Sequence, residues 1–335
     1  MVMQIKNIAV IGDGGWGTTL SVYLAKQNYP VKLWGPFPEY VRQMNQNRYN
    51  PRFLPGIRLP QTITVVDKLD VALEGSDLVI FAIPSKYASK VLSKIKRTNV
   101  DLSGKIFLSV TKGIETNTLM RMSEAIRGKL GNVPLAVLSG PTIAMEVAKD
   151  VPSTAVVASS NMRIAKTIQR IFNSKTFRIY TNKDVVGVEL GGSIKNIIAI
   201  ACGVCDGLKL GANTKAAILT RGLAEMARLG KAMGGQVKTF SGLTGLGDLV
   251  TTCISSQSRN RHVGEQLGMG KSIQQILASM EMVAEGVETV KAVHKLSQKY
   301  RIAMPITSEV YHIIYRHKNP LQAVLDLMSR KAKSE

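Results

Sequence analysis

The first forty residues constrain the fold of this chain more than any other segment. An apolar run at residues 6–11 enters a glycine-rich turn at residues 12–17, and a helical pattern over residues 18–27 leads to a second apolar run at residues 31–34. A strand, a glycine turn, a helix and a second strand within about 30 residues make up the dinucleotide-binding fingerprint in its required context. The segment predicts a βαβ unit with a nucleotide site; a glycine-rich turn without a ligand is the alternative.

Three glycines of this turn each have a physical reason to be there. Gly12 permits the tight turn, Gly14 lets the backbone approach a pyrophosphate with no Cβ in the way, and Gly17 lets the helix pack close to the strand. The amino end of the helix then offers free N–H groups and the positive end of its dipole to the phosphates. The turn therefore predicts a pyrophosphate site.

Length and composition favour a globular protein of two domains. The chain has 335 residues, of which 45% are hydrophobic and 20% are charged. No uncharged apolar run is long enough to predict a transmembrane helix, and the chain enters its first strand without the pattern of a signal peptide. Three cysteines predict no disulfide framework, which suits a reducing compartment. We therefore expect a cytoplasmic protein without stable membrane insertion.

The net charge of +21 is high enough to raise the question of a nucleic-acid or membrane partner. The basic excess is spread over both halves of the chain, however, and aromatic residues make up only 5% of it. Scarce aromatics make stacking platforms for single strands an unfavourable interpretation. We expect a generally basic surface that serves anionic small molecules, and no nucleic-acid partner.

Strands and helices alternate from the start of the chain to about residue 182. Short runs rich in Val, Ile and Leu between helical segments predict an α/β fold, with a Rossmann-like, doubly wound and mostly parallel sheet. Residues 47–60 carry three prolines and are expected to form an irregular loop. The expected strands are residues 6–11, 31–34, 62–66, 77–83, 105–110, 134–138, 153–158 and 177–181.

The pattern changes to helices from about residue 185 onward, which predicts an all-helical second domain. We expect residues 1–188 to form a dinucleotide-binding domain and residues 189–335 to form a helical substrate and catalytic domain. The residues after Met328 are expected to be a frayed terminus. The expected helices are residues 185–205, 213–233, 272–280, 286–300 and 306–317.

Lys195 is the strongest candidate for acid–base chemistry. It lies in the segment 185–205, which is apolar on nearly all sides and therefore predicts a buried helix. A buried lysine must pair, reach the surface or lose its proton, and desolvation lowers its pKa toward the range of a proton donor near neutral pH. A lysine at the helix start whose ammonium extends into solvent is the equally compatible alternative.

Three further polar segments could carry chemistry. Lys112 follows the strand 105–110 at the sheet edge where doubly wound folds bind ligands, although a surface-loop lysine fits the spacing too. Residues 139–142 follow another strand, and Pro141 is expected in the first turn of a helix. Residues 242–262 combine glycines, hydroxyls, an acid and two arginines, whose planar forks match phosphate oxygens. A polar loop between helices is the alternative for that segment.

Cysteines and histidines do not predict a metal site. Cys202 and Cys205 have C-x-x-C spacing, but they lie inside the apolar segment and are expected to be small buried residues. The chain has 4 histidines, all after residue 260 and none at i, i+4 spacing. We therefore expect a site without metal.

Taken together, the motifs match one family over nearly the whole chain. The sequence resembles the bacterial NAD(P)-dependent glycerol-3-phosphate dehydrogenases, and the order and spacing of the motifs are more specific than any one of them. The motifs are Gly12-x-Gly14-x-Trp16-Gly17, residues 111–115, 139–141, 192–199, 245–249, 258–260 and 283–286.

The resemblance implies a role for each of these residues. Lys195 would exchange a proton with the substrate oxygen, and Lys112 would contact both substrate and cofactor. The cofactor would be NAD or NADP, and the reaction would interconvert dihydroxyacetone phosphate and sn-glycerol 3-phosphate, a starting unit of phospholipids. The substrate would also touch Gly140, Thr142, Asn196, Asp248, Thr252, Ser258, Arg259 and Asn260. The cofactor would also touch Gly12, Gly14, Gly15, Trp16, Gly17, Ala144, Arg259, Val283 and Glu285.

Three positions depart from the family pattern. Asp13 puts a carboxylate inside the pyrophosphate turn, where the family usually has a small neutral residue. Pro36 follows the second strand where members often carry a basic residue near the adenosine ribose, and Thr142 replaces a common serine but keeps the hydroxyl. Because the end of this strand carries neither an acid nor an arginine, we expect dual use of NAD and NADP.

The sequence leaves two other interpretations of the function open. A related hydroxyacid-type dehydrogenase would keep the fold and take another small anionic substrate, but the phosphate signature at residues 258–260 disfavours a non-phosphorylated one. A nucleotide-sensing or nucleic-acid-binding protein is favoured by the net charge alone and would need neither Lys195 nor Asp248. A homodimer is compatible with the enzyme reading.

Overall fold

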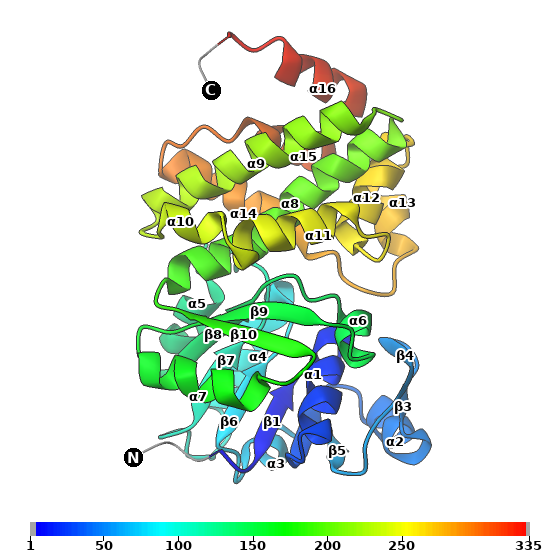
Figure 1. Cartoon of the computed structure of the whole chain (residues 1–335). Helices are drawn as coiled ribbons and strands as arrows, with labels where there is room; N and C mark the ends of the chain where they lie inside the picture. Colours follow the sequence, from blue (N-terminus) through cyan, green and yellow to red (C-terminus); the bar gives the residue numbers. More distant parts are fainter. Residues whose placement is uncertain (1–4, 333–335) are drawn as a thin grey trace.

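The structure, a computed structural model, describes residues 5–332. Two parts follow one another along the chain and stack end to end (Figure 1). The first part is a sheet with helices, and the second part contains helices without a strand in its described residues. The expected terminus after Met328 extends into residues 333–335, which lie outside the described residues.

An eight-stranded sheet organises the first part in the order β10-β9-β8-β7-β6-β1-β2-β5. All its neighbouring pairs are parallel except β8 and β9, so the predicted Rossmann-like, mostly parallel sheet is confirmed. The strands are β1 (Ile8–Ile11), β2 (Val31–Trp34), β5 (Ile63–Val66), β6 (Leu78–Phe81), β7 (Ile106–Ser109), β8 (Leu135–Ser139), β9 (Ser153–Ala158) and β10 (Phe177–Asn182).

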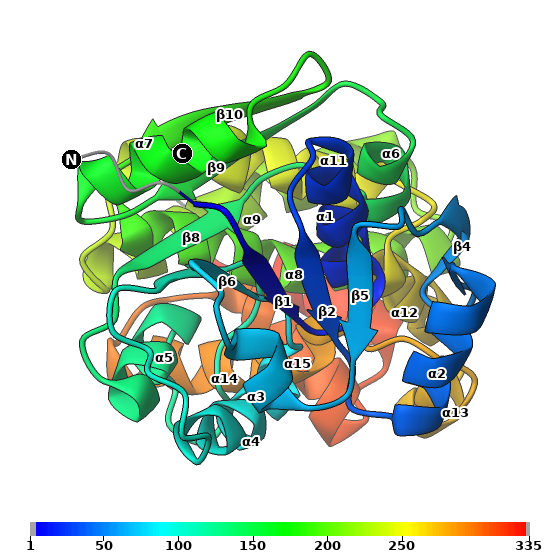
Figure 2. The same ribbon diagram turned by 90° about the horizontal axis from the view of Figure 1, so that it is seen from below.

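Helices cover both faces of this sheet because its strands are apolar on both sides (Figure 2). In β1, Ile8 and Val10 pack with one group of helices, whereas Ala9 and Ile11 pack with the other. The first group is α1 (Gly15–Lys26), α2 (Pro38–Asn47) and α7 (Met162–Phe172). The second group is α3 (Leu69–Leu73), α4 (Ser85–Lys96) and α5 (Met122–Leu130).

The prediction of an irregular loop at residues 47–60 is wrong in part. Two short antiparallel strands, β3 (Tyr49–Asn50) and β4 (Leu54–Arg58), form a separate hairpin there. A proline such as Pro55 is tolerated in a two-stranded hairpin because each strand has an edge that needs no ladder donor. Asn50 fixes the hairpin to the glycine turn, since its Nδ2 donates to the backbone oxygen of Asp13 at 2.7 Å.

The helical part is built around α8 (Val185–Gly207), whose side chains are almost all buried. This helix has the length and apolarity of a membrane span, but other helices cover it, so it is a core helix. The five predicted helices are present; four short ones and a π-helical turn, η1, were not predicted. The surrounding elements are α9 (Ala212–Ala232), α10 (Val237–Phe240), η1 (Leu243–Gly247), α11 (Asp248–Ile254), α12 (Arg259–Gly268), α13 (Ile273–Ala278), α14 (Glu285–Lys299), α15 (Pro305–Arg316) and α16 (Pro320–Met328).

The division of the chain at residue 188 stays a prediction, because α8 crosses that position as one continuous helix. Glycines set how closely this helix approaches its neighbour α12. A Cβ at Gly203 would overlap the backbone of Arg261, and a Cβ at Gly264 would overlap the backbone of Ile200. The two helices therefore touch backbone to backbone, which fixes the start of α12 relative to α8.

Candidate functional site

Lys195 and a buried acid form the centre of the site. The Nζ of Lys195 lies 2.9 Å from Oδ1 of Asp248 and 2.6 Å from Oγ1 of Thr252. Lys195 comes from α8, whereas both partners come from the short helix α11. Lys195 is 6% exposed and Asp248 1% exposed, so the alternative of an ammonium that extends into solvent is wrong.

A second lysine meets the same carboxylate from the other part of the chain. The Nζ of Lys112, in the loop after β7, lies 2.7 Å from Oδ2 of Asp248 and 2.8 Å from the backbone oxygen of Gly140. A longer contact of 3.3 Å reaches Oγ1 of Thr142. The surface-loop alternative for Lys112 is therefore wrong, and each oxygen of one carboxylate binds one ammonium.

The environment of this cluster lowers the pKa of both Lys112 and Asp248, for different reasons. Burial, together with repulsion from Lys195, lowers the pKa of Lys112 to about 8 despite the attraction of Asp248. Burial alone would raise the pKa of Asp248, but the two ammonium groups hold it below its ordinary value. At neutral pH the cluster therefore holds an ionised acid between the two lysine side chains.

The fold brings these side chains together because β7 and β8 are neighbours, and the end of β8 and Lys112 after β7 both lie against α8. A Cβ at Gly192 would overlap Oγ of Ser139, so α8 passes directly over the end of β8. Asn196, one residue along α8, donates from Nδ2 to the backbone oxygen of Lys112 at 3.2 Å. Pro141 does not start a helix as expected, since α6 (Ala144–Ala148) begins three residues later.

The glycine turn lies at the amino end of α1, as its sequence predicts. Gly12 has a φ of +122°, and a Cβ at Gly17 would overlap the backbone oxygen of Gly12. A Cβ at Gly14 would meet nothing within 4 Å, which leaves open space in front of the helix N-terminus. Gly15 begins α1, and the partly buried Trp16 follows it. An orphaned helix end in open space is the geometry that a pyrophosphate requires.

A third group of predicted residues gathers at the starts of α12 and α14. Exposed Arg259 donates from Nη1 to the backbone oxygen of Val283 at 2.8 Å. Buried Asn260 accepts from the backbone N–H of Gly286 at 2.9 Å through Oδ1. Ser258 caps α12, because its hydroxyl accepts from the backbone N–H of Arg261. These contacts hold the two helix starts side by side.

Glu285 connects the helical part to the sheet part. Its Oε2 accepts a hydrogen bond from Oγ of Ser85 at 3.1 Å, at the amino end of α4. Burial raises the pKa of Glu285 to about 7, against the hydrogen bond from Ser85 and the charge of Arg259. Ser85 was not predicted as a site residue. The signal that could have found it is its place at the start of α4, after the turn that follows β6, at a sheet edge where ligands bind.

The remaining predicted residues lie around these groups. Ala144 begins α6, and its backbone oxygen accepts from Oγ1 of Thr19 on α1 at 3.1 Å. Cys202 and Cys205 are buried free thiols, as expected. Within residues 5–332, no three His, Cys, Asp or Glu side chains gather in an arrangement that could hold a metal ion.

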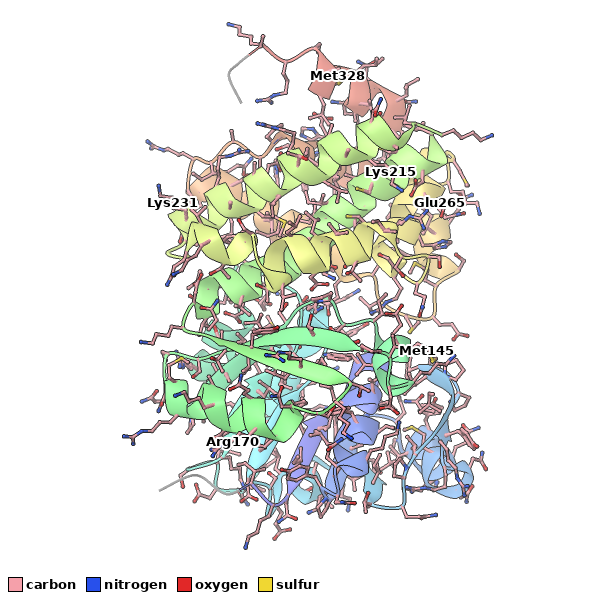
Figure 3. All side chains as sticks on the ribbon, in the orientation of Figure 1. Met145, Arg170, Lys215, Lys231, Glu265 and Met328 are labelled. Atoms are coloured by element: carbon pink, nitrogen blue, oxygen red, sulfur yellow. The ribbon has the colours of Figure 1, made fainter. Side chains whose placement is uncertain are left out.

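Basic side chains project from both parts of the molecule. Arg170 on α7 and Lys231 on α9 are exposed and point away from their elements at well-separated places (Figure 3). This distribution agrees with a generally basic surface rather than one basic patch.

Comparison with known proteins identifies the family. Residues 7–165 match the family described as NAD-dependent glycerol-3-phosphate dehydrogenase N-terminus, and residues 184–325 match its C-terminus. The chain belongs to the NAD-dependent glycerol-3-phosphate dehydrogenase family. A glycerol-3-phosphate dehydrogenase [NAD(P)+] of Chlorobium limicola is 47% identical to it over 332 residues, which cover 98% of this chain and 99% of the relative.

Solved structures of glycerol-3-phosphate dehydrogenases have the same fold. The enzyme of Coxiella burnetii superposes with a TM-score of 0.94 at 39% identity, covering 97% of this chain and 99% of that one. The Plasmodium falciparum enzyme gives a TM-score of 0.88 at 27% identity, covering 98% and 97%. Both the sheet part and the helical part of this chain are therefore those of the family.

Proposed function

We propose that this chain is a glycerol-3-phosphate dehydrogenase that reversibly reduces dihydroxyacetone phosphate to sn-glycerol 3-phosphate with NADH or NADPH. The observation that carries the proposal is the buried Lys112–Asp248–Lys195 cluster. It lies where the end of the sheet meets the helical part, beside the helix starts that hold Arg259 and Asn260. Membership of the family supports the same reaction.

Lys195 is the group that handles the proton. The ketone oxygen gains negative charge as it is reduced, and a positioned ammonium stabilises that charge and then donates a proton. Asp248 keeps Lys195 oriented, since Oδ1 lies 2.9 Å from Nζ. Thr252 holds the same Nζ from a second side at 2.6 Å. In the oxidation direction Lys195 takes the proton back.

Cationic and polar side chains around this centre fit an anionic three-carbon substrate. Lys112 and Arg259 supply positive charge, and a guanidinium can bind phosphate oxygens with two parallel hydrogen bonds. Gly140 and Thr142 lie at Lys112, and Ser258 and Asn260 flank Arg259. We propose that this set holds the phosphate and hydroxyl groups and so orients the substrate carbonyl toward Lys195.

The glycine turn fits the pyrophosphate of a dinucleotide. The space in front of Gly14, and the close packing that Gly12 and Gly17 permit, are the features that such a group needs. We propose that the turn binds it together with Gly15 and Trp16, and that Lys112, Ala144, Arg259, Val283 and Glu285 contact the rest of the cofactor. The bound nicotinamide supplies or accepts the hydride. The meeting of the two parts at Ser85 and Glu285 helps to keep water away.

Several wider properties accompany the proposal. The product is a starting unit for phospholipids, and we propose that the enzyme works in the cytoplasm for that synthesis. A small-molecule phosphate, rather than a nucleic acid, is the partner for which the basic surface is suited. A homodimer is the assembly that we would test first by sedimentation.

An assay of cofactor oxidation tests the proposed function. Purified protein should oxidise NADH and NADPH only when dihydroxyacetone phosphate is present, and a chelator should not change the rate. A non-phosphorylated 2-keto acid serves as the matched control substrate, and we expect no turnover with it. Folded protein that turns over the keto acid, but not the phosphate, would support the related hydroxyacid-type dehydrogenase instead.

A further inference from the structure

Asp13 is an acid in an unusual environment within the glycine turn. Its side chain is buried, with 6% of the residue exposed, and among residues 5–332 its Oδ2 has no hydrogen-bond partner. The neighbouring polar side chains bind its backbone instead: Thr18 and Asn50 both donate to the backbone oxygen of Asp13, at 3.0 and 2.7 Å. A buried acceptor without a donor is rare in native proteins and calls for an explanation.

The carboxylate of Asp13 points to the carboxyl end of β2. A Cβ at Gly35, the residue directly after this strand, would overlap Oδ2 of Asp13. The two residues come together because β1 and β2 are parallel neighbours, with Ile11 opposite Trp34 at their ends. The absence of a side chain at residue 35 therefore makes room for the acid.

That position has a known chemical function in dinucleotide-binding folds. An acid at the end of the second strand accepts a hydrogen bond from the 2′-hydroxyl of the adenosine ribose and disfavours the 2′-phosphate of NADP. Here Gly35 and Pro36 provide no acid at the end of β2. The next acid along the chain, Glu39, is highly exposed and pairs with Arg42. Asp13 brings a carboxylate to the same place from the neighbouring strand.

The energetics of Asp13 agree with a binding role. Burial raises the pKa of Asp13 to about 6, against a hydrogen bond from its own backbone and the attraction of Arg52, so the acid stays mostly ionised at neutral pH. Within the described residues its Oδ2 is left without a partner. A buried, unpaired charge is costly, and groups of this kind concentrate at functional sites because a ligand provides the missing hydrogen bond.

We infer that Asp13 is the residue that recognises the adenosine ribose: its carboxylate accepts a hydrogen bond from the 2′-hydroxyl of NAD(H) and disfavours the 2′-phosphate of NADP(H). The inference rests on the proposed binding of the dinucleotide at the glycine turn. It does not exclude use of NADP(H), because the basic surface attracts the more anionic cofactor and opposes the effect of Asp13.

Equilibrium binding tests the inference without turnover. The fluorescence of NADH and NADPH is titrated with wild-type protein, Asp13→Asn and the control Glu39→Gln, which removes the same charge from an exposed position nearby. In Asp13→Asn we expect the ratio of the NADPH and NADH dissociation constants to shift ten- to hundredfold toward NADPH, the size expected for one charge-assisted hydrogen bond. Glu39→Gln should shift the ratio less than about twofold.

A modified cofactor separates hydrogen bonding from charge. NADH that lacks the adenosine 2′-hydroxyl should bind the wild type about tenfold or more weakly than NADH, whereas Asp13→Asn should discriminate much less between the two. Thermal unfolding verifies that Asp13→Asn is folded. A second variant, Gly35→Ala, displaces the carboxylate of Asp13 and should shift the ratio of the NADPH and NADH dissociation constants in the same direction as Asp13→Asn.

Any of four results would overturn the inference. An unchanged ratio in Asp13→Asn, or an equal shift in Glu39→Gln, would show that Asp13 is not a specific determinant. Equal binding of NADH and its 2′-deoxy form by the wild type would show that no hydrogen bond to this hydroxyl is made. If the wild type bound neither cofactor, the proposed function and the inference would both fail. The other results overturn the inference alone, because in them the wild type still binds its cofactors.

Discussion

Asp248 has to balance two ammonium groups, and this shapes what each lysine can do. Its Oδ1 pairs with Lys195 and its Oδ2 pairs with Lys112, so each lysine has its own oxygen of the carboxylate. Removing one lysine leaves the acid paired with the other. Removing the acid would leave two buried cations side by side, a much more costly change. Substitutions of the lysines are therefore the informative ones.

The variant Lys195→Met tests the proton-transfer role. Methionine keeps the apolar length of the side chain, and Asp248 keeps Lys112 as its partner, so the protein should fold and bind NADH nearly as before. Turnover should fall by about 10²–10⁴-fold, the usual contribution of a general acid. The control His262→Gln changes an exposed titratable group on α12 and should lose far less. A larger loss in His262→Gln would overturn the assignment.

Lys112 gives the enzyme a pH dependence at its alkaline side. With a pKa of about 8, its ammonium is present below pH 8 and is lost as the pH rises above it. Since kcat/KM reports the ionisation of the free enzyme, kcat/KM for dihydroxyacetone phosphate should decline above about pH 8. Lys112→Arg should move this decline to higher pH, because a guanidinium stays charged.

Lys105→Arg is the matched control for that profile. Lys105 precedes the amino end of β7, whereas Lys112 follows its carboxyl end, and its Nζ binds the backbone oxygen of Ser76. The control should keep the midpoint of the wild type. If Lys112→Arg also kept it, Lys112 would not be the group that titrates.

At the level of elements, the contact between α8 and α12 positions Lys195 relative to Asn260. Because a Cβ at Gly264 would overlap the backbone of Ile200, the substitution Gly264→Ala must push the two helices apart. Overpacking of this kind costs about 1–3 kcal/mol of unfolding free energy or more. We also expect a higher KM for dihydroxyacetone phosphate, since Arg259 and Asn260 lie at the start of the displaced helix. Denaturant unfolding and steady-state kinetics measure the two effects.

Gly128→Ala controls for the intrinsic effect of replacing a helical glycine. Gly128 lies in α5, and a Cβ there would meet nothing within 4 Å. Alanine should therefore stabilise the protein by up to about 1 kcal/mol and leave KM unchanged. Equal stability changes in the two variants would contradict the close-packing argument.

The same elements show what sequence reasoning can and cannot reach. The eight sheet strands and the helices α8, α9, α14 and α15 are predictable because their apolar patterns are strong. The hairpin at residues 49–58 is not, because its strands are short and contain proline. Helix α11 has only 7 residues, too few for a clear periodic pattern. Helix α12 is short and polar, and its glycines pack it against the backbone of α8, a contact that no pattern of its own predicts.

For the site, sequence reasoning identifies candidate residues but not their pairing. Lys195 is conspicuous in an apolar helix, and Lys112 in a loop after a strand. Their common partner Asp248 is 53 residues from one and 136 from the other, and no local pattern reports such a contact. Asp13 is recognisable as a departure from the family pattern, but only the three-dimensional neighbourhood of β1 and β2 shows that it faces Gly35.

Over the whole molecule, the net charge of +21 forms a positive field that both substrate and cofactor must enter. The field comes from basic side chains spread over the surface, such as Arg170 and Lys231, and not from the few buried cations of the site. Exposed charges are screened by salt, whereas buried pairs such as Lys195 and Asp248 are screened much less. Attraction of ligands and the chemical step should therefore respond differently to ionic strength.

This difference predicts the salt dependence of the enzyme. Between about 10 mM and 300 mM salt, kcat/KM for dihydroxyacetone phosphate should fall severalfold, while kcat should change less than about twofold. The two cofactors form an internal control, because NADPH differs from NADH only by the charged 2′-phosphate. The kcat/KM for NADPH should decline more steeply than that for NADH, so any preference for NADPH at low salt should shrink as salt is added. Parallel declines of kcat/KM for the two cofactors, or an equal decline in kcat, would show that the surface field does not guide these anions. The local groups around Asp13 and Arg259 would then determine cofactor and substrate affinity without the field.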